Sequence, residues 1–389
     1  MPHFGRNRRI LTIFGIPLKI NLSWFLILAL VVWSLAQGYF PHMAGLEGQE
    51  LSTFTYWLLG IAGAAGLFVS LIAHELSHSI VARSTGMPVS GITLFIFGGV
   101  SELEEEPPTA GAEFFMAVVG PISSVCIGAV FLVAWAVLTF RMNFGGGWVA
   151  LLRYLWTINF LLAAFNSLPA FPLDGGRVLR SLLWAYTHNL QKSTRIASTV
   201  GSTFAMVLIV GGVLLAFQGV LITGIWLIFI GLFLRRAAMS AMQDTVLRLH
   251  LTGERVGRFM TENPVTVSPD LNLEKFVDEY VLHYHFTHFP VVNEDGELVG
   301  IVRARDPKQV DSERWPELHV SDVMEEPDPA RTIAPSAEAV EALSRLRGEQ
   351  RKRLIVVEDN RPVGIVSLRD LVDFLALKID LSPRNLPEG

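Results

Sequence analysis

Residues 73–78 read Ala73-His74-Glu75-Leu76-Ser77-His78, a His-Glu-x-x-His pattern inside a hydrophobic run. On a helix, positions i and i+4 lie on one face, so His74 and His78 can bind the same metal ion. Zinc suits such nitrogen ligands, and a catalytic zinc keeps one coordination position open for water. Glu75 can then serve as the general base. The run from Leu58 to Val81 is otherwise almost uncharged, and an ionisable cluster at membrane depth indicates function because it is costly.

The composition indicates a membrane domain followed by a soluble one. Of the 389 residues, 51% are hydrophobic, and the apolar residues crowd the first 240 positions while the charged ones crowd the rest. The net charge of -5 is mild and offers no nucleic-acid footprint. Because Cys126 is the single cysteine, a disulfide framework and a thiolate metal site are both excluded.

The hydrophobic pattern predicts an α-helical polytopic membrane domain with about six transmembrane helices. The expected spans cover about residues 22–40, 54–83, 114–140, 149–168, 196–217 and 220–234. Lys and Arg gather before the first span, after the last one and in the loops of the same face, which by the positive-inside rule predicts cytosolic N- and C-termini. We expect the protein in a bacterial or archaeal cell membrane, and the orientation places the His-Glu motif near the cytosolic end of the second span.

A short β-prone segment lies between the second and third expected spans, from Gly91 to Val100. It is too short to cross a membrane as a helix, and exposed strand edges are excluded from lipid, so we expect it to line a protein cavity. A free strand edge beside the metal could pair with an extended substrate by strand addition. The alternative is a simple interfacial loop.

The fourth expected span ends at Asn166-Ser167-Leu168-Pro169-Ala170-Phe171-Pro172-Leu173-Asp174-Gly175-Gly176. The prolines must end the helix, and the glycine pair allows a close backbone approach. Taken alone, the segment could be an ordinary Pro-rich turn. Beside His74 and His78, however, Asp174 would complete a two-histidine, one-carboxylate site with water in the fourth position.

These three motifs, in this order, resemble the site-2 protease family of intramembrane zinc metalloproteases over about residues 1–240. The resemblance implies that His74, His78 and Asp174 bind one catalytic Zn²⁺ per chain and that Glu75 is the catalytic base. It also implies that the substrate is a transmembrane helix of a membrane protein, admitted sideways from the lipid bilayer and locally unwound before cleavage.

The same resemblance assigns two further groups to the substrate. Asn166 would hold the substrate backbone or the developing oxyanion, a role that suits an amide donor. Gly98, Gly99 and Val100 would belong to the substrate-facing strand or re-entrant loop.

The C-terminal region contains an internal repeat with an offset of 64 residues, which predicts two copies of one small α/β unit. Gly300-Ile301-Val302 recurs as Gly364-Ile365-Val366, and each copy contains two β-rich runs that flank a turn. The repeat resembles a tandem pair of CBS domains on the cytosolic side. That resemblance implies binding of ATP or another adenine nucleotide, regulation of the protease, and a homodimer formed through the CBS pair.

The ribose-binding pattern of CBS domains differs between the two copies. Copy two matches it with Ser367 and Asp370, whereas copy one keeps Asp306 but has Arg303 in place of the hydroxyl residue. We therefore expect any nucleotide mainly at Ser367 and Asp370. Arg303 could instead contact a phosphate, or it could abolish that half-site.

The predicted domains are residues 1–240 for the protease, 241–255 for a linker, 256–315 and 316–378 for the two CBS domains, and 379–389 for a disordered tail. Two alternatives for the whole chain remain: a CBS-regulated transporter or channel, and a catalytically silent scaffold. For the CBS pair alone, the alternative is dimerisation or substrate docking without a nucleotide. Three nearby histidines, His283, His285 and His288, lack a carboxylate or thiol partner at typical spacing and are expected at the surface instead of at a second metal.

Overall fold

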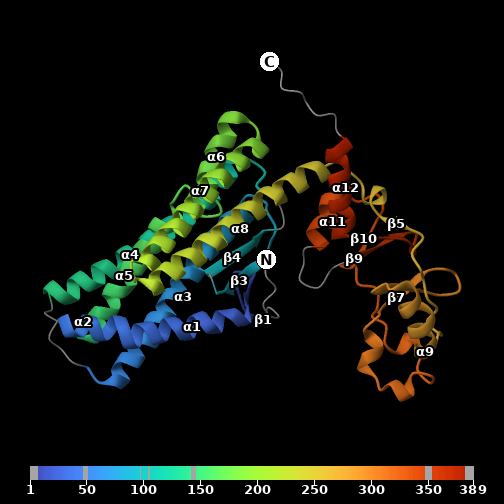
Figure 1. The fold of residues 1–389 in the computed structure, drawn as a ribbon, viewed down its shortest axis with the longest axis horizontal. Coiled ribbons are helices and arrows are strands. Elements are labelled where there is room, and N and C mark those ends of the chain that lie inside the picture. Colours follow the sequence, from blue (N-terminus) through green and yellow to red (C-terminus); the bar gives the residue numbers. More distant parts are fainter. Residues whose placement is uncertain are drawn as a thin grey trace. The chain divides into compact units, whose positions relative to one another are not determined.

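The computed structural model of the chain describes residues 8–46, 51–96, 98–103, 106–141, 146–346 and 353–381 (Figure 1). Two compact units divide the chain, Met1–Gln243 and Asp244–Gly389. The first is mainly helical and the second is mixed α/β.

Six helices of the described chain are long and apolar enough to cross a membrane, which confirms the expected multi-pass domain. They are α1 (Leu22–Ser34) continued by a π turn and α2 (Phe40–Leu46), α3 (Thr53–Ser84), α4 (Ala110–Ala136), α5 (Gly147–Asn166), α7 (Leu190–Phe217) and α8 (Leu221–Leu251). Side-chain oxygens cap several N-termini, for example Ser52 on α3 and Thr109 on α4, and so satisfy the first free amides.

A four-stranded sheet in the membrane unit has the order β1-β2-β3-β4. Its strands are β1 (Arg8–Ile13), β2 (Ile16–Ile20), β3 (Val89–Phe95) and β4 (Gly98–Leu103), and β2 runs parallel to β3. The β1–β2 hairpin was not predicted, although the alternation of Ile16, Leu18 and Ile20, all buried, is the strand signature.

The expected β-prone segment is confirmed as a hairpin formed by β3 and β4, in which Gly99 lies opposite Leu94. In this order β4 lies at one edge of the sheet and β1 lies at the other. No other described strand pairs with β4. A free row of backbone groups is therefore available on the strand that carries Gly98, Gly99 and Val100.

Two helical segments were not predicted, one a separate helix and the other an extension of the last span. A further helix, α6 (Asp174–Thr187), begins at the Asp that ends the Pro-rich segment. Helix α8 continues past the predicted end of the last span to Leu251, through most of the expected linker. Its last turns remain helical because Leu247 and Leu251 are buried in the core of the second unit, where tertiary packing stabilises a charged helix.

The second unit contains two small sheets and short helices. The strands are β5 (Thr261–Glu262), β6 (His288–Val292), β7 (Leu298–Arg303), β8 (Thr332–Ile333), β9 (Arg353–Glu358) and β10 (Arg361–Ser367), and the longer helices are α11 (Ala339–Leu346) and α12 (Leu368–Leu381). One sheet has the order β5-β10-β9-β8 and the other pairs β6 with β7. Helix α12 runs three residues into the predicted tail, and residues 382–389 lie outside the described residues.

The internal repeat is visible in the strand register. In copy one His288 lies opposite Arg303, and in copy two Arg353 lies opposite Ser367 at the equivalent position of the hairpin. The copies also interlock, because Met324 of copy two packs where Gly300 of copy one has no Cβ. Equivalent positions thus share one backbone frame but carry different side chains.

Candidate functional site

Three potential metal ligands converge in the membrane unit. Asp174 Oδ2 lies 3.0 Å from His74 Nε2 and 3.2 Å from His78 Nε2, and the two Nε2 atoms are 3.2 Å apart. Both histidines come from α3, one helical turn apart, and the aspartate comes from the first turn of α6. The structure therefore brings together three residues that the sequence analysis assigned to one site.

The other ring nitrogen of each histidine already has a partner. His78 Nδ1 donates to the carbonyl oxygen of Met116 at 2.6 Å, and His74 Nδ1 is 2.9 Å from Ser124 Oγ. Since a backbone carbonyl can only accept, the neutral His78 ring carries its proton on Nδ1 and directs the Nε2 lone pair toward the other ligand atoms. Both partners lie on α4, whose backbone forms one wall of the site.

This donor set fits a zinc ion. Ligand atoms at 2.0–2.1 Å from a tetrahedral metal lie roughly 3.3 Å from one another. The observed separations of 3.0 to 3.2 Å are close to that spacing. Two imidazoles and one carboxylate also leave a fourth position, which is the arrangement of catalytic rather than structural zinc sites.

A glycine makes the close approach of α4 possible. A Cβ atom at position 120 would lie 2.7 Å from His74 Nε2 and closer still to the His78 ring. Only a residue without a side chain fits there.

Ion pairs hold α6, the helix that carries Asp174, against α4. Arg180, two turns along α6, donates through Nε to Glu113 Oε1 of α4 at 2.5 Å and through Nη2 to Glu106 at 3.1 Å. Burial acts to lower the pKa of the Arg180 guanidinium, but Glu113 and Glu106 outweigh it and raise that pKa. The guanidinium also lies over the ring of Phe171 in the Pro-rich segment. These contacts fix α6 against α4 and thereby orient Asp174.

The expected base is bound to the edge strand. Glu75 Oε2 accepts a hydrogen bond of 2.9 Å from Ser101 Oγ, and Ser101 lies on β4. A Cβ at Gly99 would lie 2.7 Å from Glu75 Cγ, so the side chain of Glu75 packs directly on the β4 backbone. The carboxylate that follows the first ligand is thus held beside the edge strand.

Asn166 ends α5 and is half-buried, and its Nδ2 donates to the carbonyl oxygen of Leu162 in its own helix at 3.1 Å. One of its two amide hydrogens therefore remains for another acceptor. A second amide, Asn159, is fully buried and donates to Ser70 Oγ at 3.0 Å between α5 and α3. This hydrogen bond joins α5 to α3 at Ser70, one helical turn before His74.

The two predicted nucleotide half-sites differ in the second unit. In copy two, Asp370 Oδ2 accepts from both the backbone amide and the hydroxyl of Ser367 at 2.8 Å. In copy one, Asp306 accepts the equivalent backbone amide, but the Arg303 guanidinium also donates to its other oxygen at 3.1 Å. Gln309 adds a further contact to that oxygen at 3.3 Å, and Asp306 is 3% exposed.

Sequence reasoning missed Ser101, Ser124, Arg180 and Glu113. Each meets its partner only through the packing of elements that are distant in the chain, and none stands in a motif. For Glu113, the available signal was its position as the single charge within the apolar helix α4. The three expected surface histidines also separate, because His288 begins β6 and is half-buried while His283 and His285 are exposed.

The model of Peptidase family M50 matches residues 62–143 and 140–208, and the CBS domain model matches residues 256–308 and 320–377. Over 375 residues the chain is 33% identical to "Putative zinc metalloprotease sll0528" of Synechocystis, covering 95% of this chain and 96% of that protein. It is 34% identical to "Putative zinc metalloprotease Rip3" of Mycobacterium tuberculosis over 358 residues, covering 92% and 90%.

Among solved structures, the chain is similar to a site-2 protease from Methanocaldococcus jannaschii, with 30% identity and a TM-score of 0.41 over 61% of this chain and 95% of that one. The similarity to the two metalloproteases extends over both units, so it includes the C-terminal repeat as well as the helices. The chain therefore belongs to the M50 family of zinc metalloproteases, the site-2 protease group, and carries a pair of CBS domains behind a multi-pass membrane domain.

Proposed function

We propose that this enzyme is an intramembrane endopeptidase that cleaves transmembrane segments of membrane proteins, in the manner of regulated intramembrane proteolysis. The observation that carries the proposal is the convergence of His74, His78 and Asp174 on one point at an apolar helix bundle. Membership of the metalloprotease family favours this function over the transporter alternative.

The proposed catalytic roles follow from the contacts of each side chain. His74, His78 and Asp174 would hold one zinc ion, which when bound would polarise the scissile carbonyl and make water more acidic. Glu75, the residue after the first histidine, would accept the proton of the attacking water and later deliver it to the leaving amine. Its hydrogen bond to Ser101 keeps the carboxylate beside the strand edge, where a peptide bond of the substrate would be presented.

We propose that the substrate binds as an added strand on β4. A transmembrane helix has satisfied its own backbone hydrogen bonds, so its amides must be transferred to new partners before cleavage. The free edge at Gly98, Gly99 and Val100 offers those partners next to Glu75. The half-buried amide of Asn166 would hold the substrate backbone or the developing oxyanion.

The experiment for catalysis compares the wild-type enzyme with Glu75→Gln, using zinc analysis and cleavage of a single-span substrate. We expect one zinc per chain in both forms and a loss of cleavage of about 10²-fold or more in the variant, the contribution of a positioned base. Zinc absent from both forms, or equal cleavage by both, would overturn the proposal.

The binding mode is tested with synthetic substrates that carry one backbone N-methyl group at successive positions around the cleavage site. Successive amides of a strand point in opposite directions, so only every second methyl group should raise KM. A uniform effect at all positions, or none, would contradict strand addition.

We also propose that an adenine nucleotide binds to the CBS pair and changes protease activity. The support is chemical: Asp370 has one oxygen committed to Ser367, whereas the carboxylate of Asp306 is already occupied by Arg303 and Gln309. The ribose hydroxyls would therefore bind at copy two. The orientation with both termini in the cytosol, inferred from the Lys and Arg distribution, would expose this unit to cellular nucleotides.

A matched pair of variants tests this assignment, because Asp370→Asn and Asp306→Asn remove the same negative charge from the acceptors of equivalent turns. At 100 times the dissociation constant, ATP should stabilise the wild type by about 2.7 kcal/mol. We expect Asp370→Asn to lose this stabilisation and Asp306→Asn to keep it. Unchanged melting and cleavage on titration of the wild type would refute nucleotide control.

A further inference from the structure

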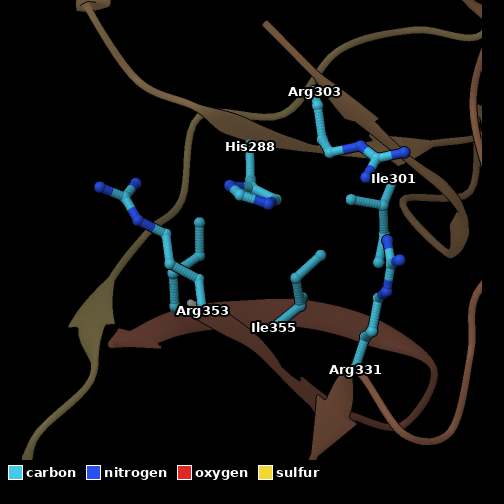
Figure 2. A pocket seen from close by; sticks show the side chains of 7 residues that line it. His288, Ile301, Arg303, Arg331, Arg353 and Ile355 are labelled. Carbon is cyan, nitrogen blue, oxygen red and sulfur yellow. The ribbon is translucent and has the colours of Figure 1, made fainter. Parts of the chain in front are cut away.

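A basic pocket lies between the two copies of the C-terminal repeat (Figure 2). One histidine and three arginines form the polar part of its lining, and three isoleucines form the apolar part. The lining residues are His288, Arg303, Arg331, Arg353, Ile301, Ile355 and Ile365. In Figure 2 the side chains of Arg303 and Arg331 approach each other from opposite walls, while Arg353 and His288 lie toward the other side. Both copies therefore contribute cations to one space.

The positive charge of the pocket acts on its histidine. The pKa of His288 falls to about 4, first because the ring is buried and then because Arg353, Arg303 and Arg331 oppose a further positive charge. The three arginines that oppose a positive charge on the ring would favour an anion in the same place.

One carboxylate already bridges the two converging arginines. Glu325 forms ion pairs with Arg303 Nη2 and with Arg331 Nη1, and it is the one carboxylate among the described residues that joins them. Its backbone is fixed by reciprocal hydrogen bonds of 2.9 Å with Ile301. The side chain is 40% exposed, so it can rotate into solvent without disturbing that backbone.

Charge favours a polyanion over this single carboxylate. Arg303 also has Asp306 on its Nε, but no carboxylate of the described chain forms an ion pair with Arg353. Glu325 supplies one negative charge to two guanidinium groups, whereas a diphosphate or triphosphate supplies several together with more acceptor oxygens. The apolar floor of isoleucines favours desolvated, close contacts over a loosely held hydrated ion.

We infer that this pocket binds the di- or triphosphate group of a ligand and that Glu325 is a built-in substitute for the phosphate, which the ligand must displace. The inference rests on the proposed nucleotide function and adds the ligand class and the competition that sets its affinity. A nucleoside carries no anion that could replace the ion pairs of Glu325, and a single phosphate competes with less charge than a diphosphate or triphosphate. The carboxylate thus makes the module selective for highly charged ligands.

The test uses the full-length protein in detergent and calorimetric titration with inorganic triphosphate, without a nucleoside. Glu325→Gln should bind triphosphate about tenfold more tightly, because a neutral amide competes less well for the two guanidinium groups. The matched control is Glu326→Gln, which alters the neighbouring exposed carboxylate, one without an ion pair among the described residues, and should leave the affinity unchanged. Arg331→Met should weaken binding about tenfold or more. Equal melting temperatures of the variants would establish that folding is preserved.

Separate outcomes distinguish the two proposals. Unchanged or weaker triphosphate binding by Glu325→Gln would overturn the competition, even if ATP binding still depended on Asp370. Tighter triphosphate binding by that variant, with ATP no better than triphosphate and no effect of Asp370→Asn, would support the pocket and refute the adenine nucleotide. Failure of triphosphate to bind both the wild type and Glu325→Gln would refute the pocket as a phosphate site.

Discussion

The membrane unit and the CBS pair each gather ionisable groups at one point, but they gather opposite chemistry. In the membrane unit, the lone pairs of two imidazoles and a carboxylate converge, an arrangement that a cation stabilises. In the CBS pair, three guanidinium groups surround a pocket, and the carboxylate of Glu325 forms ion pairs with two of them. The difference distinguishes a site for a permanent cofactor from a site for an exchangeable ligand. In the CBS pocket, the side chain of Glu325 takes the place of the proposed ligand, and the membrane-unit site has no such side chain among the described residues.

The largest effect is expected when one proposed metal ligand is removed from the site in the membrane unit. Asp174→Ala should abolish zinc retention and substrate cleavage, since two histidines from one helix cannot by themselves complete a tight site. Added zinc should raise the melting temperature of the metal-depleted wild type but not that of the variant. A variant that still retains one zinc per chain would show that Asp174 is not a ligand.

The next effect concerns the charges that fasten α6. Arg180→Met leaves Glu113, which is fully buried, without its partner and should destabilise the membrane unit by roughly 3 kcal/mol or more. The double variant Arg180→Met with Glu113→Met removes both charges and should recover much of the loss. Thermal denaturation in detergent measures both, and equal stability of the single and double variants would contradict a paired interaction.

A smaller effect is expected at the hydrogen bond behind the first histidine. Ser124→Ala removes the partner of His74 Nδ1 and should weaken zinc affinity about tenfold, the usual cost of losing such an orienting contact. Ser123→Ala is the matched control, because within the described part of the chain that hydroxyl binds only a carbonyl of its own helix. Competition with a chelator measures the two affinities, which should differ if Ser124 orients the ring.

The smallest effect lies in the CBS pair and depends on pH. The pKa of His288 is lowered from 6.5 to about 4, so the unfolded chain binds a proton before the folded one does. The contribution of His288 to the free energy of unfolding should therefore be constant above pH 6.5 and should fall as the pH drops from 6.5 toward 4. His288→Gln should flatten this part of the melting profile, whereas profiles that remain parallel to the wild type would refute the assignment.

The convergence of His74, His78 and Asp174 was predictable from the sequence, because each stands in a dense local pattern. His74 and His78 share a helix face by spacing, and Asp174 follows a proline-enforced helix end. Glu113 and Arg180 were not predictable, since their pairing depends on how α4 and α6 pack. The same holds for Ser101, which reaches Glu75 only because β4 lies at the edge of the sheet.

In the CBS pair the repeat predicted the architecture better than the chemistry. The equivalence of Arg303 and Ser367 could be read from the offset, and both open alternatives for Arg303 involved the ligand. The structure adds contacts of its guanidinium with Asp306 and Glu325 of the same chain, which neither alternative included. No spacing rule connects residues 303 and 325, because their contact arises from the bridge between Ile301 and Glu325.

The glycine at position 120 has a consequence for how such enzymes are recognised. A chain with the three metal-binding residues intact but alanine at this place would pass any search for the His-Glu-x-x-His pattern and still have a methyl group where the imidazoles meet. In the proposed active centre, the absence of a side chain at position 120 is as necessary as the three residues that would bind the metal. Sorting active from inactive homologues therefore requires reading the helix opposite the motif, one position at a time.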